Sequence, residues 1–237
     1  MRSLFFPAAS RGTKNIGWLK SRFHFSFSDY CNPALSAFGT LVAFNDDLLQ
    51  QGKGFGTHPH GNMEIISVLI NGKMNHKDSM GYSTVIDEGG VQIMSAGSGL
   101  FHEEYNIGEE EVNFLQIWIQ PKILNVRSRY QLRHFPKNER KGILKTIISS
   151  EEGLEHCWIN QNAKLSLGYF EEEKNVEYNF NPVNKCVFVF VIEGTIRIAD
   201  MELNKGDAIG IWETDTVSIQ TKNETEFIVI ETPVNQK

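Results

Sequence analysis

Short runs of hydrophobic residues recur along the chain and are separated by turns rich in Gly, Asn and Asp. Consecutive apolar residues are typical of buried strands, and alternating ones of half-buried strands. The strands expected on these grounds are 23–27, 41–44, 64–70, 73–78, 83–86, 91–94 and 114–119. Turns are expected at 45–47 and 79–82, and hairpins at 71–72 and 87–90. The first half therefore predicts antiparallel β structure.

The second half of the chain repeats this pattern. Strands are expected at 187–192, 195–199, 217–220 and 226–231, and Leu203 to Ile211 resembles Ile86 to Met94. Short strands with closely spaced turns, used twice, predict an all-β fold of two tandem antiparallel β-barrels. We expect an N-terminal domain at 1–130 and a C-terminal domain at 131–237. The polar and basic residues at 122–140 are expected to form a connector.

Composition narrows the functional classes. The 237 residues carry a net charge of -6 with no basic patch, which argues against direct binding of nucleic acid. Three cysteines lie far apart, so a disulfide framework is not expected and a reducing compartment fits best. No apolar run is long enough for a secretory signal or a membrane span. The expected location is the cytoplasm, without membrane attachment.

Two pairs of polar residues stand out against the apolar strands. His58 and His60 are two residues apart, and so are His102 and Glu104. Residues two apart in a strand point to the same face, so each pair can converge on one point. Three imidazoles and a carboxylate suit a divalent transition metal. Glu64, four residues after His60, is an alternative fourth ligand that faces the same way if the strand continues.

Several motifs resemble the pirin family of the cupin superfamily. They include Gly56-Thr57-His58-Pro59-His60 with Met63-Glu64-Ile65, the Ile-Met-Ser-Ala-Gly-x-Gly segment at 93–99, and His-x-Glu-Tyr-Asn at 102–106. Gln116-Ile117-Trp118-Ile119 fits as well, as do Gly17-Trp18-Leu19, Phe25-Ser26-Phe27, Phe38-Gly39 and Phe44-Asn45-Asp46-Asp47 upstream. The resemblance spans about residues 15–130. It implies a bicupin whose N-terminal barrel alone holds one metal.

The resemblance also implies ligands and an activity. The ligands carried over are His58, His60, His102 and Glu104, and Glu64 becomes a nearby carboxylate that orients an imidazole or takes a substrate proton. The implied metal is Fe(2+), which Mn, Ni, Cu, Zn or Co can replace. The implied reaction is quercetin 2,3-dioxygenase-type cleavage of a small aromatic, flavonol-like substrate with O2, with Glu104 or Glu64 accepting the hydroxyl proton.

Two other functions remain open. One is a non-catalytic metal or redox sensor that binds a protein partner, and the other is a cupin whose metal is only structural. The family usually places a basic residue after the second histidine, where this chain has Gly61 and Asn62. A positive charge near the pocket is therefore expected to be missing.

The remaining candidate residues are expected to be structural. We expect His76 on a strand surface, and His24, His134 and His156 in structural or exposed positions. The large apolar residues expected in the barrel core are Met94, Phe114 and Trp118.

Overall fold

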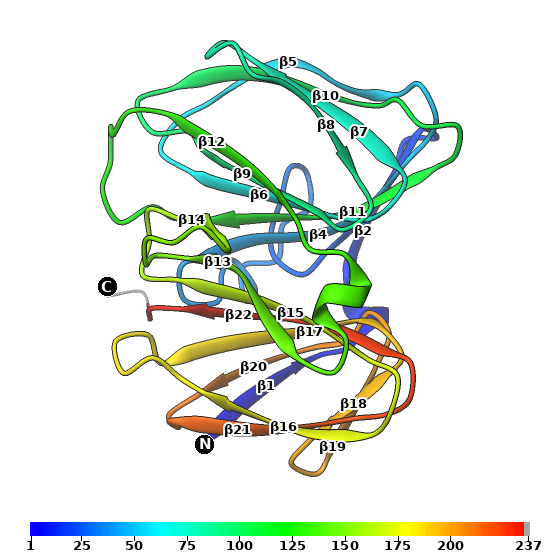
Figure 1. The fold of residues 1–237 in the computed structure, drawn as a ribbon, viewed down its shortest axis with the longest axis vertical. Helices are drawn as coiled ribbons and strands as arrows, with labels where there is room; N and C mark the ends of the chain where they lie inside the picture. Colours follow the sequence, from blue (N-terminus) through cyan, green and yellow to red (C-terminus); the bar gives the residue numbers. More distant parts are fainter. Residues whose placement is uncertain (235–237) are drawn as a thin grey trace.

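The computed structural model describes residues 1–234, and almost all of its regular structure is β-strand. The strands form four sheets, two in each half of the molecule (Figure 1). Two short 3-10 helices interrupt them at η1 (Ala8–Ser10) and η2 (Lys137–Arg140). Among the described residues there is no helix with the length and hydrophobicity that crossing a lipid bilayer requires.

The first half contains a seven-stranded and a four-stranded sheet. The larger one has the order β12 (Arg129–His134), β9 (Gly90–Ser95), β6 (Glu64–Asn71), β11 (Val112–Ile119), β4 (Leu41–Leu49), β3 (Leu19–Phe23) and β2 (Gly12–Asn15). The smaller one has the order β5 (Gly54–His60), β10 (Leu100–Asn106), β7 (Lys73–Asp78) and β8 (Ser83–Asp87).

The second half also contains one seven-stranded and one four-stranded sheet. Its larger sheet has the order β1 (Arg2–Phe6), β20 (Ala208–Trp212), β17 (Cys186–Glu193), β22 (Thr225–Thr232), β15 (Lys164–Phe170), β13 (Leu144–Ser149) and β14 (Cys157–Trp158). Its smaller sheet has the order β16 (Lys174–Asn179), β21 (Thr216–Thr221), β18 (Thr195–Ile198) and β19 (Met201–Asn204). The predicted use of one strand pattern twice is therefore present in the fold.

Two strands depart from the expected division at residue 130. The N-terminal strand β1 pairs with β20 in the second half, at the edge that β12 occupies beside β9 in the first half. Strand β12 runs to His134, so the expected connector at 122–140 contains a strand of the first sheet. Each strand covers an otherwise unpaired sheet edge, which is a non-local contact that the sequence pattern does not reveal.

The two seven-stranded sheets lie against each other in the middle of the molecule, and the four-stranded sheets lie outside them (Figure 1). Their shared core takes Ile66 from β6, Ile117 from β11, Phe188 from β17 and Ile228 from β22, all fully buried. Alternate residues of these strands point the other way, into each half. The domains are therefore joined by a continuous apolar core.

Three predicted turns differ in the structure. The turns at 71–72 and 87–90 join strands of different sheets, so neither is a hairpin. Residues 45–47 are not a turn but the middle of β4. The turn at 79–82 does join paired strands, because β7 pairs with β8. Hydrophobic pattern identifies a turn, but packing decides whether the chain returns to the same sheet.

The interiors of the two halves differ in chemistry. In the second half, β16 and β21 bury Tyr178, Val217 and Ile219 in an apolar cluster. The equivalent strands of the first half are β5 and β10, which carry the histidines. Polar side chains thus line the first interior where apolar ones fill the second.

Candidate metal centre

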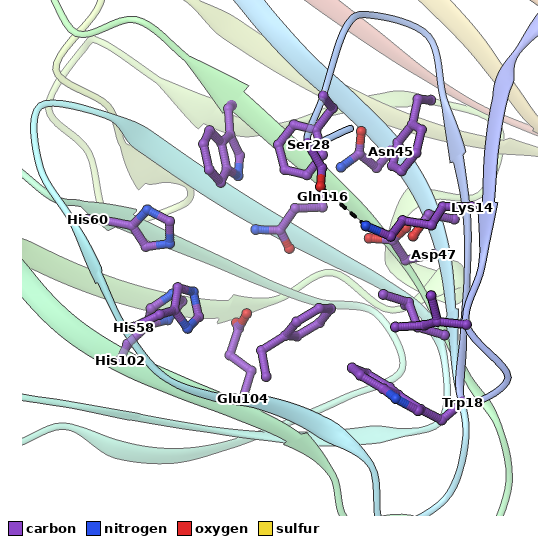
Figure 2. Close-up of a pocket in the computed structure, with 17 residues that line it drawn as sticks. Lys14, Trp18, Ser28, Asn45, Asp47, His58, His60, His102, Glu104 and Gln116 are labelled. Atoms are coloured by element: carbon purple, nitrogen blue, oxygen red, sulfur yellow. Dashed lines mark hydrogen bonds between the residues drawn. The ribbon is translucent and has the colours of Figure 1, made fainter. Parts of the chain in front are cut away.

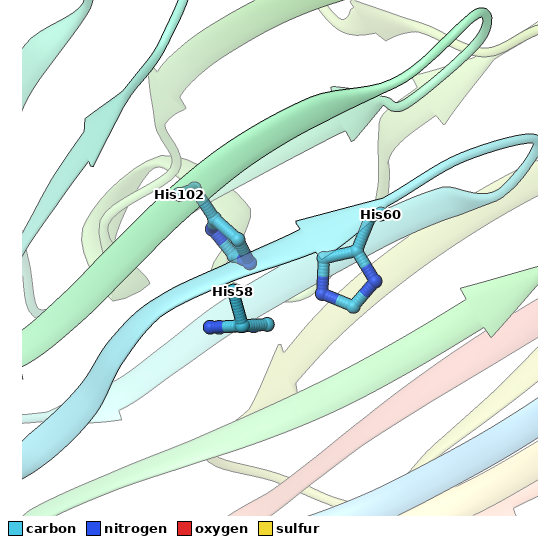
Figure 3. A group of neighbouring side chains, drawn as sticks. All are labelled: His58, His60 and His102. Atoms are coloured by element: carbon cyan, nitrogen blue, oxygen red, sulfur yellow. The ribbon is translucent and has the colours of Figure 1, made fainter.

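Three histidines meet where strands β5 and β10 run side by side. The strands pair antiparallel with His58 opposite His102, and His60 lies two residues further along β5. Gly54 allows this close pairing, because a Cβ there would lie 2.2 Å from the Glu104 carbonyl oxygen. The ring centroids are 4.4–5.0 Å apart, and the rings face a common space (Figure 3). The structure brings together the three predicted imidazoles.

The nitrogens of these rings are suited to a metal ion. One nitrogen from each of His58, His60 and His102 lies within 4.8 Å of the others. Ligands bound at about 2.1 Å to one ion lie at most about 4.2 Å apart, so adjustments of less than about 1 Å would close the site. The site therefore has the donor type and the spacing that a metal needs.

His102 gives the clearest sign that something belongs here. It is 2% exposed, and neither ring nitrogen has a hydrogen-bond partner among residues 1–234. Burying a polar group without a partner is costly, and although the nitrogens of buried His24 are also unpartnered, His24 has phenylalanine rings around it whereas His102 faces two further imidazoles, so a ligand is expected at His102. The donor set of three imidazoles fits a divalent transition ion.

Protonation also favours metal binding. Burial, with repulsion from neighbouring imidazoles, lowers the pKa of His60 and of His102 to about 4. Both rings are therefore neutral at pH 7. The His58 Nδ1 atom lies 2.7 Å from the Gly56 carbonyl oxygen, which can only accept, so Nδ1 carries the proton. That hydrogen bond leaves Nε2 of His58 with its lone pair free for an ion.

Glu104 lies beside this group rather than within it. Its carboxylate belongs to a second group with His76 and His102, whose donor atoms also lie within 4.8 Å of one another. A bulge between His102 and Glu104 shifts the pairing of β10 with β5 there. The predicted set of four is thus present as three converging histidines and an adjacent carboxylate.

A chain of hydrogen bonds orients the Glu104 carboxylate. Gln92 donates from Nε2 to Glu104 Oε1 and to Ser67 Oγ, the latter at 3.0 Å. Ser67 Oγ donates in turn to Gln116 Oε1 at 3.1 Å. The Tyr130 hydroxyl donates to Gln92 Oε1 at 3.1 Å, which fixes the Gln92 amide with its nitrogen toward Glu104.

His76 is not on the strand surface, so that prediction is wrong. It is fully buried, opposite Glu104 on the paired strand β10. Its Nε2 lies 3.0 Å from Asp78 Oδ2 and its Nδ1 lies 4.0 Å from Glu104 Oε1. Burial disfavours its charge, but the two carboxylates outweigh it and raise the pKa of His76. Met74, His76 and Asp78 alternate along β7, and this alternation indicates that His76 shares the buried face of Met74.

The same neighbours act on Glu104. Burial alone would favour its neutral form, but the hydrogen bond and charge of His76, together with the hydrogen bond from Gln92, lower the pKa of Glu104. The carboxylate is therefore ionised at pH 7. It complements a bound cation, and its second oxygen, Oε2, is the one left for an ion or a substrate.

Glu64 lies elsewhere. It is fully buried on the face of β6 that Ile66 shares, toward the second domain, and its Oε2 accepts from Ser95 Oγ at 2.7 Å and Asn160 N at 3.2 Å. The strand does not continue from His60 to Glu64, because Asn62 has a φ of +51° and the chain changes sheets there. The expectation that Glu64 faces the same way as His60, which assumed one unbroken strand, is therefore wrong. The structure does not bring Glu64 to the histidines.

A cavity of about 370 Å³ opens beside the histidines (Figure 2). Aromatic rings from several strands and loops form much of its wall, namely those of Trp18, Phe23, Phe27, Phe55 and Trp118. Trp118 thus contacts the cavity, whereas Phe114 and Met94 are buried in the core as expected. The volume of the cavity falls within the range of about 300–1,000 Å³ that is typical of small-molecule sites.

Polar residues of this cavity were missed in the sequence. Asn45 and Asp47 line it from β4, and Lys14 lines it from β2. A positive charge near the pocket was expected to be missing, but Lys14 supplies one. Its Nζ atom pairs with Asp29 Oδ1 at 2.8 Å. The turn expected at 45–47 is instead part of β4, where Asn45 and Asp47 are two residues apart and share one face.

The other histidines are structural or exposed, as expected. His24 is buried among the rings of Phe6, Phe44, Phe188 and Phe190, and its pKa is lowered to about 3 by burial. The exposed His134 pairs with Asp87, and the half-buried His156 contacts the carbonyl oxygen of Cys157. All three cysteines are free.

Comparisons with known proteins identify relatives of this chain. A family model described as Pirin matches residues 7–119, and one described as Quercetinase C-terminal cupin domain matches residues 146–232. The chain is 32% identical over 228 residues to the quercetin 2,3-dioxygenase of Escherichia coli strain K12, covering 95% of this chain and 96% of that protein. It is 30% identical over 226 residues to a pirin-like protein of Caulobacter vibrioides, covering 95% and 97%. The crystal structure of the bacterial pirin YhhW from Escherichia coli in complex with nickel(II) superposes with a TM-score of 0.92 at 30% identity, covering 98% of this chain and 100% of that one.

Proposed function

This chain belongs to the pirin family, and from that membership we propose that it is a metal-dependent dioxygenase of the quercetin 2,3-dioxygenase type, acting on a flavonol-like substrate with O2. The observation that carries the proposal is the buried His102 imidazole, which has no partner among residues 1–234 and faces two further histidines beside an aromatic cavity. The proposal takes each half of the chain as a cupin barrel, supported by its facing seven- and four-stranded sheets.

The proposed metal ligands are His58, His60, His102 and Glu104. A bound divalent ion would supply Lewis acidity together with open positions for O2 and a hydroxy-ketone. We take the ion to be Fe(2+), and the nickel complex of the related YhhW supports a site that accepts other divalent ions. Because apolar side chains fill the interior of the second half, we assign metal binding to the first half alone.

The chain's own residues would bind the substrate and move its proton. The aromatic rings of Trp18, Phe55 and Trp118 offer flat faces to a planar ligand and exclude water from it. The ionised Glu104 can accept the proton of the substrate hydroxyl through Oε2, because Gln92 holds Oε1. Glu64 has no such path in this structure, so we assign the proton transfer to Glu104.

The test is turnover by metal-loaded protein. Protein loaded with Fe(2+) under anaerobic conditions is mixed with quercetin and then exposed to air, and flavonol absorbance and carbon monoxide are measured. We expect bleaching with carbon monoxide release, its loss in His102→Ala, and its retention in His134→Ala, which alters an exposed histidine away from the cavity. Turnover no greater than that of the free metal would refute the enzyme and favour a non-catalytic sensor that binds a protein partner. The cytoplasmic location stays a prediction that fractionation of cells would test.

A further inference from the structure

The wall of the cavity away from the histidines carries two acceptors that lack donors. Asn45 and Asp47 are 2% and 4% exposed, and both line the cavity. Among residues 1–234, neither Asn45 Oδ1 nor Asp47 Oδ1 has a hydrogen-bond partner. Figure 2 shows both on the side away from His58, His60 and His102.

The fold holds these two side chains in place. They are two apart on β4, so they share one face, and β4 is paired on both sides. Asn45 lies opposite Gln116 on β11, and Asp47 lies opposite Ser21 on β3. Gln116 is in turn held by Ser67. The acceptors are therefore fixed on a rigid sheet, as a specific binding site requires.

We propose that Asn45 and Asp47 form a subsite that binds hydroxyl groups on the part of the substrate farthest from the metal. Unpaired buried acceptors discriminate strongly in favour of a ligand that supplies donors, and against an otherwise identical ligand that lacks them. Five Phe and Trp rings contribute to the remaining walls, so the fitting ligand is a polyhydroxylated aromatic molecule. This inference rests on the proposed function and narrows its substrate class.

The raised pKa of Asp47 is consistent with a buried carboxyl whose Oδ1 atom receives no hydrogen bond. Burial raises the pKa of Asp47 to about 7, and the charges of Asp46 and Glu104 add to the rise. A phenolic hydroxyl would supply the hydrogen bond that the wall lacks. The neighbouring Asp46 points to the opposite face of the strand, where its Oδ2 atom lies 3.1 Å from Arg11 Nη1. Asp46 therefore offers a control carboxylate on the same strand.

The experiment compares two flavonols in binding rather than turnover. Nickel-loaded protein is titrated without O2 with quercetin and with 3-hydroxyflavone, which keeps the reacting hydroxy-ketone but lacks the other hydroxyls. Tryptophan fluorescence gives both dissociation constants. At about pH 8, above the raised pKa of Asp47, the carboxylate is ionised, and we expect the protein to prefer quercetin by about tenfold or more, the usual effect of a hydrogen bond to a charged group. Asp47→Leu, which removes the acceptor, should lose most of this preference, and Asp46→Asn, which alters the neighbouring carboxylate, should keep it.

The outcomes separate this inference from the proposed function. An unchanged preference in Asp47→Leu would overturn the subsite even if quercetin is cleaved, and would mean that water satisfies these acceptors. A preference that depends on Asp47 without any turnover would support the subsite and refute the dioxygenase. Failure of both flavonols to bind the unmodified protein would overturn both. Because leucine has nearly the shape of aspartate, and burial already disfavours the charge of Asp47 by raising its pKa, loss of folding is not expected.

Discussion

Replacing Gln92 with Leu tests how the Glu104 carboxylate is held in place. Gln92 is 3% exposed, and its Nε2 is the donor to Glu104 Oε1. Leucine has a similar size but no donor, so the carboxylate loses this bond. Ser67 keeps Gln116 and Tyr130 keeps Thr84 at 2.6 Å, so both hydroxyls retain one partner, and Glu104 is the charged group that loses a donor.

Of the three hydrogen bonds that Gln92→Leu removes, the one to the charged carboxylate sets the magnitude. A hydrogen bond to a charged group is worth about 1.5–3 kcal/mol, so the metal-free protein should be destabilised by about that amount. Residues that orient a metal ligand typically change metal affinity about 10- to 100-fold. We therefore expect nickel affinity to fall within this range in Gln92→Leu, while the three histidines remain in place.

The assay is a double-mutant cycle. Nickel affinity is measured by competition with a chelator in the unmodified protein, Gln92→Leu, Glu104→Gln and the double variant, and urea unfolding of the metal-free forms gives stability. If Gln92 acts through Glu104, adding Gln92→Leu to Glu104→Gln should cost little more affinity. An equal loss in both backgrounds would refute the reasoning, and Tyr130→Phe, which spares the donor to Glu104, should bind nickel almost normally.

Three further perturbations test other parts of the structure. His102→Leu should abolish nickel binding seen by calorimetry, whereas His24→Leu, equally buried but among phenylalanines, should bind nickel normally. Burial raises the pKa of Asp47 from 3.8 to about 7, so the folded protein holds this proton more tightly than the unfolded chain. The free energy of unfolding in urea should therefore fall by up to about 4 kcal/mol from pH 4 to pH 7, and Asp47→Asn should flatten that decline. Phe188→Ala, at the fully buried domain junction, should cost about 3–5 kcal/mol in urea unfolding but leave nickel affinity unchanged.

The sequence determined those features that depend on a single strand. Periodicity identified β6, β7 and β11, and the spacing of His58 with His60 placed both imidazoles on one face. Side chains alternate within an unbroken strand, so parity is a local property that the sequence can specify. The motifs around these strands also carried the family resemblance.

Tertiary structure decided whatever depends on which sheet a strand joins. The corner at Asn62 turned Glu64 toward the second domain, and pairing with β10 placed His76 beside Glu104. Pairing with β3 and β11 made Asn45 and Asp47 part of the cavity wall rather than a turn. Parity does not pass through a corner between sheets, because the direction of the chain beyond it is set by contacts with distant strands.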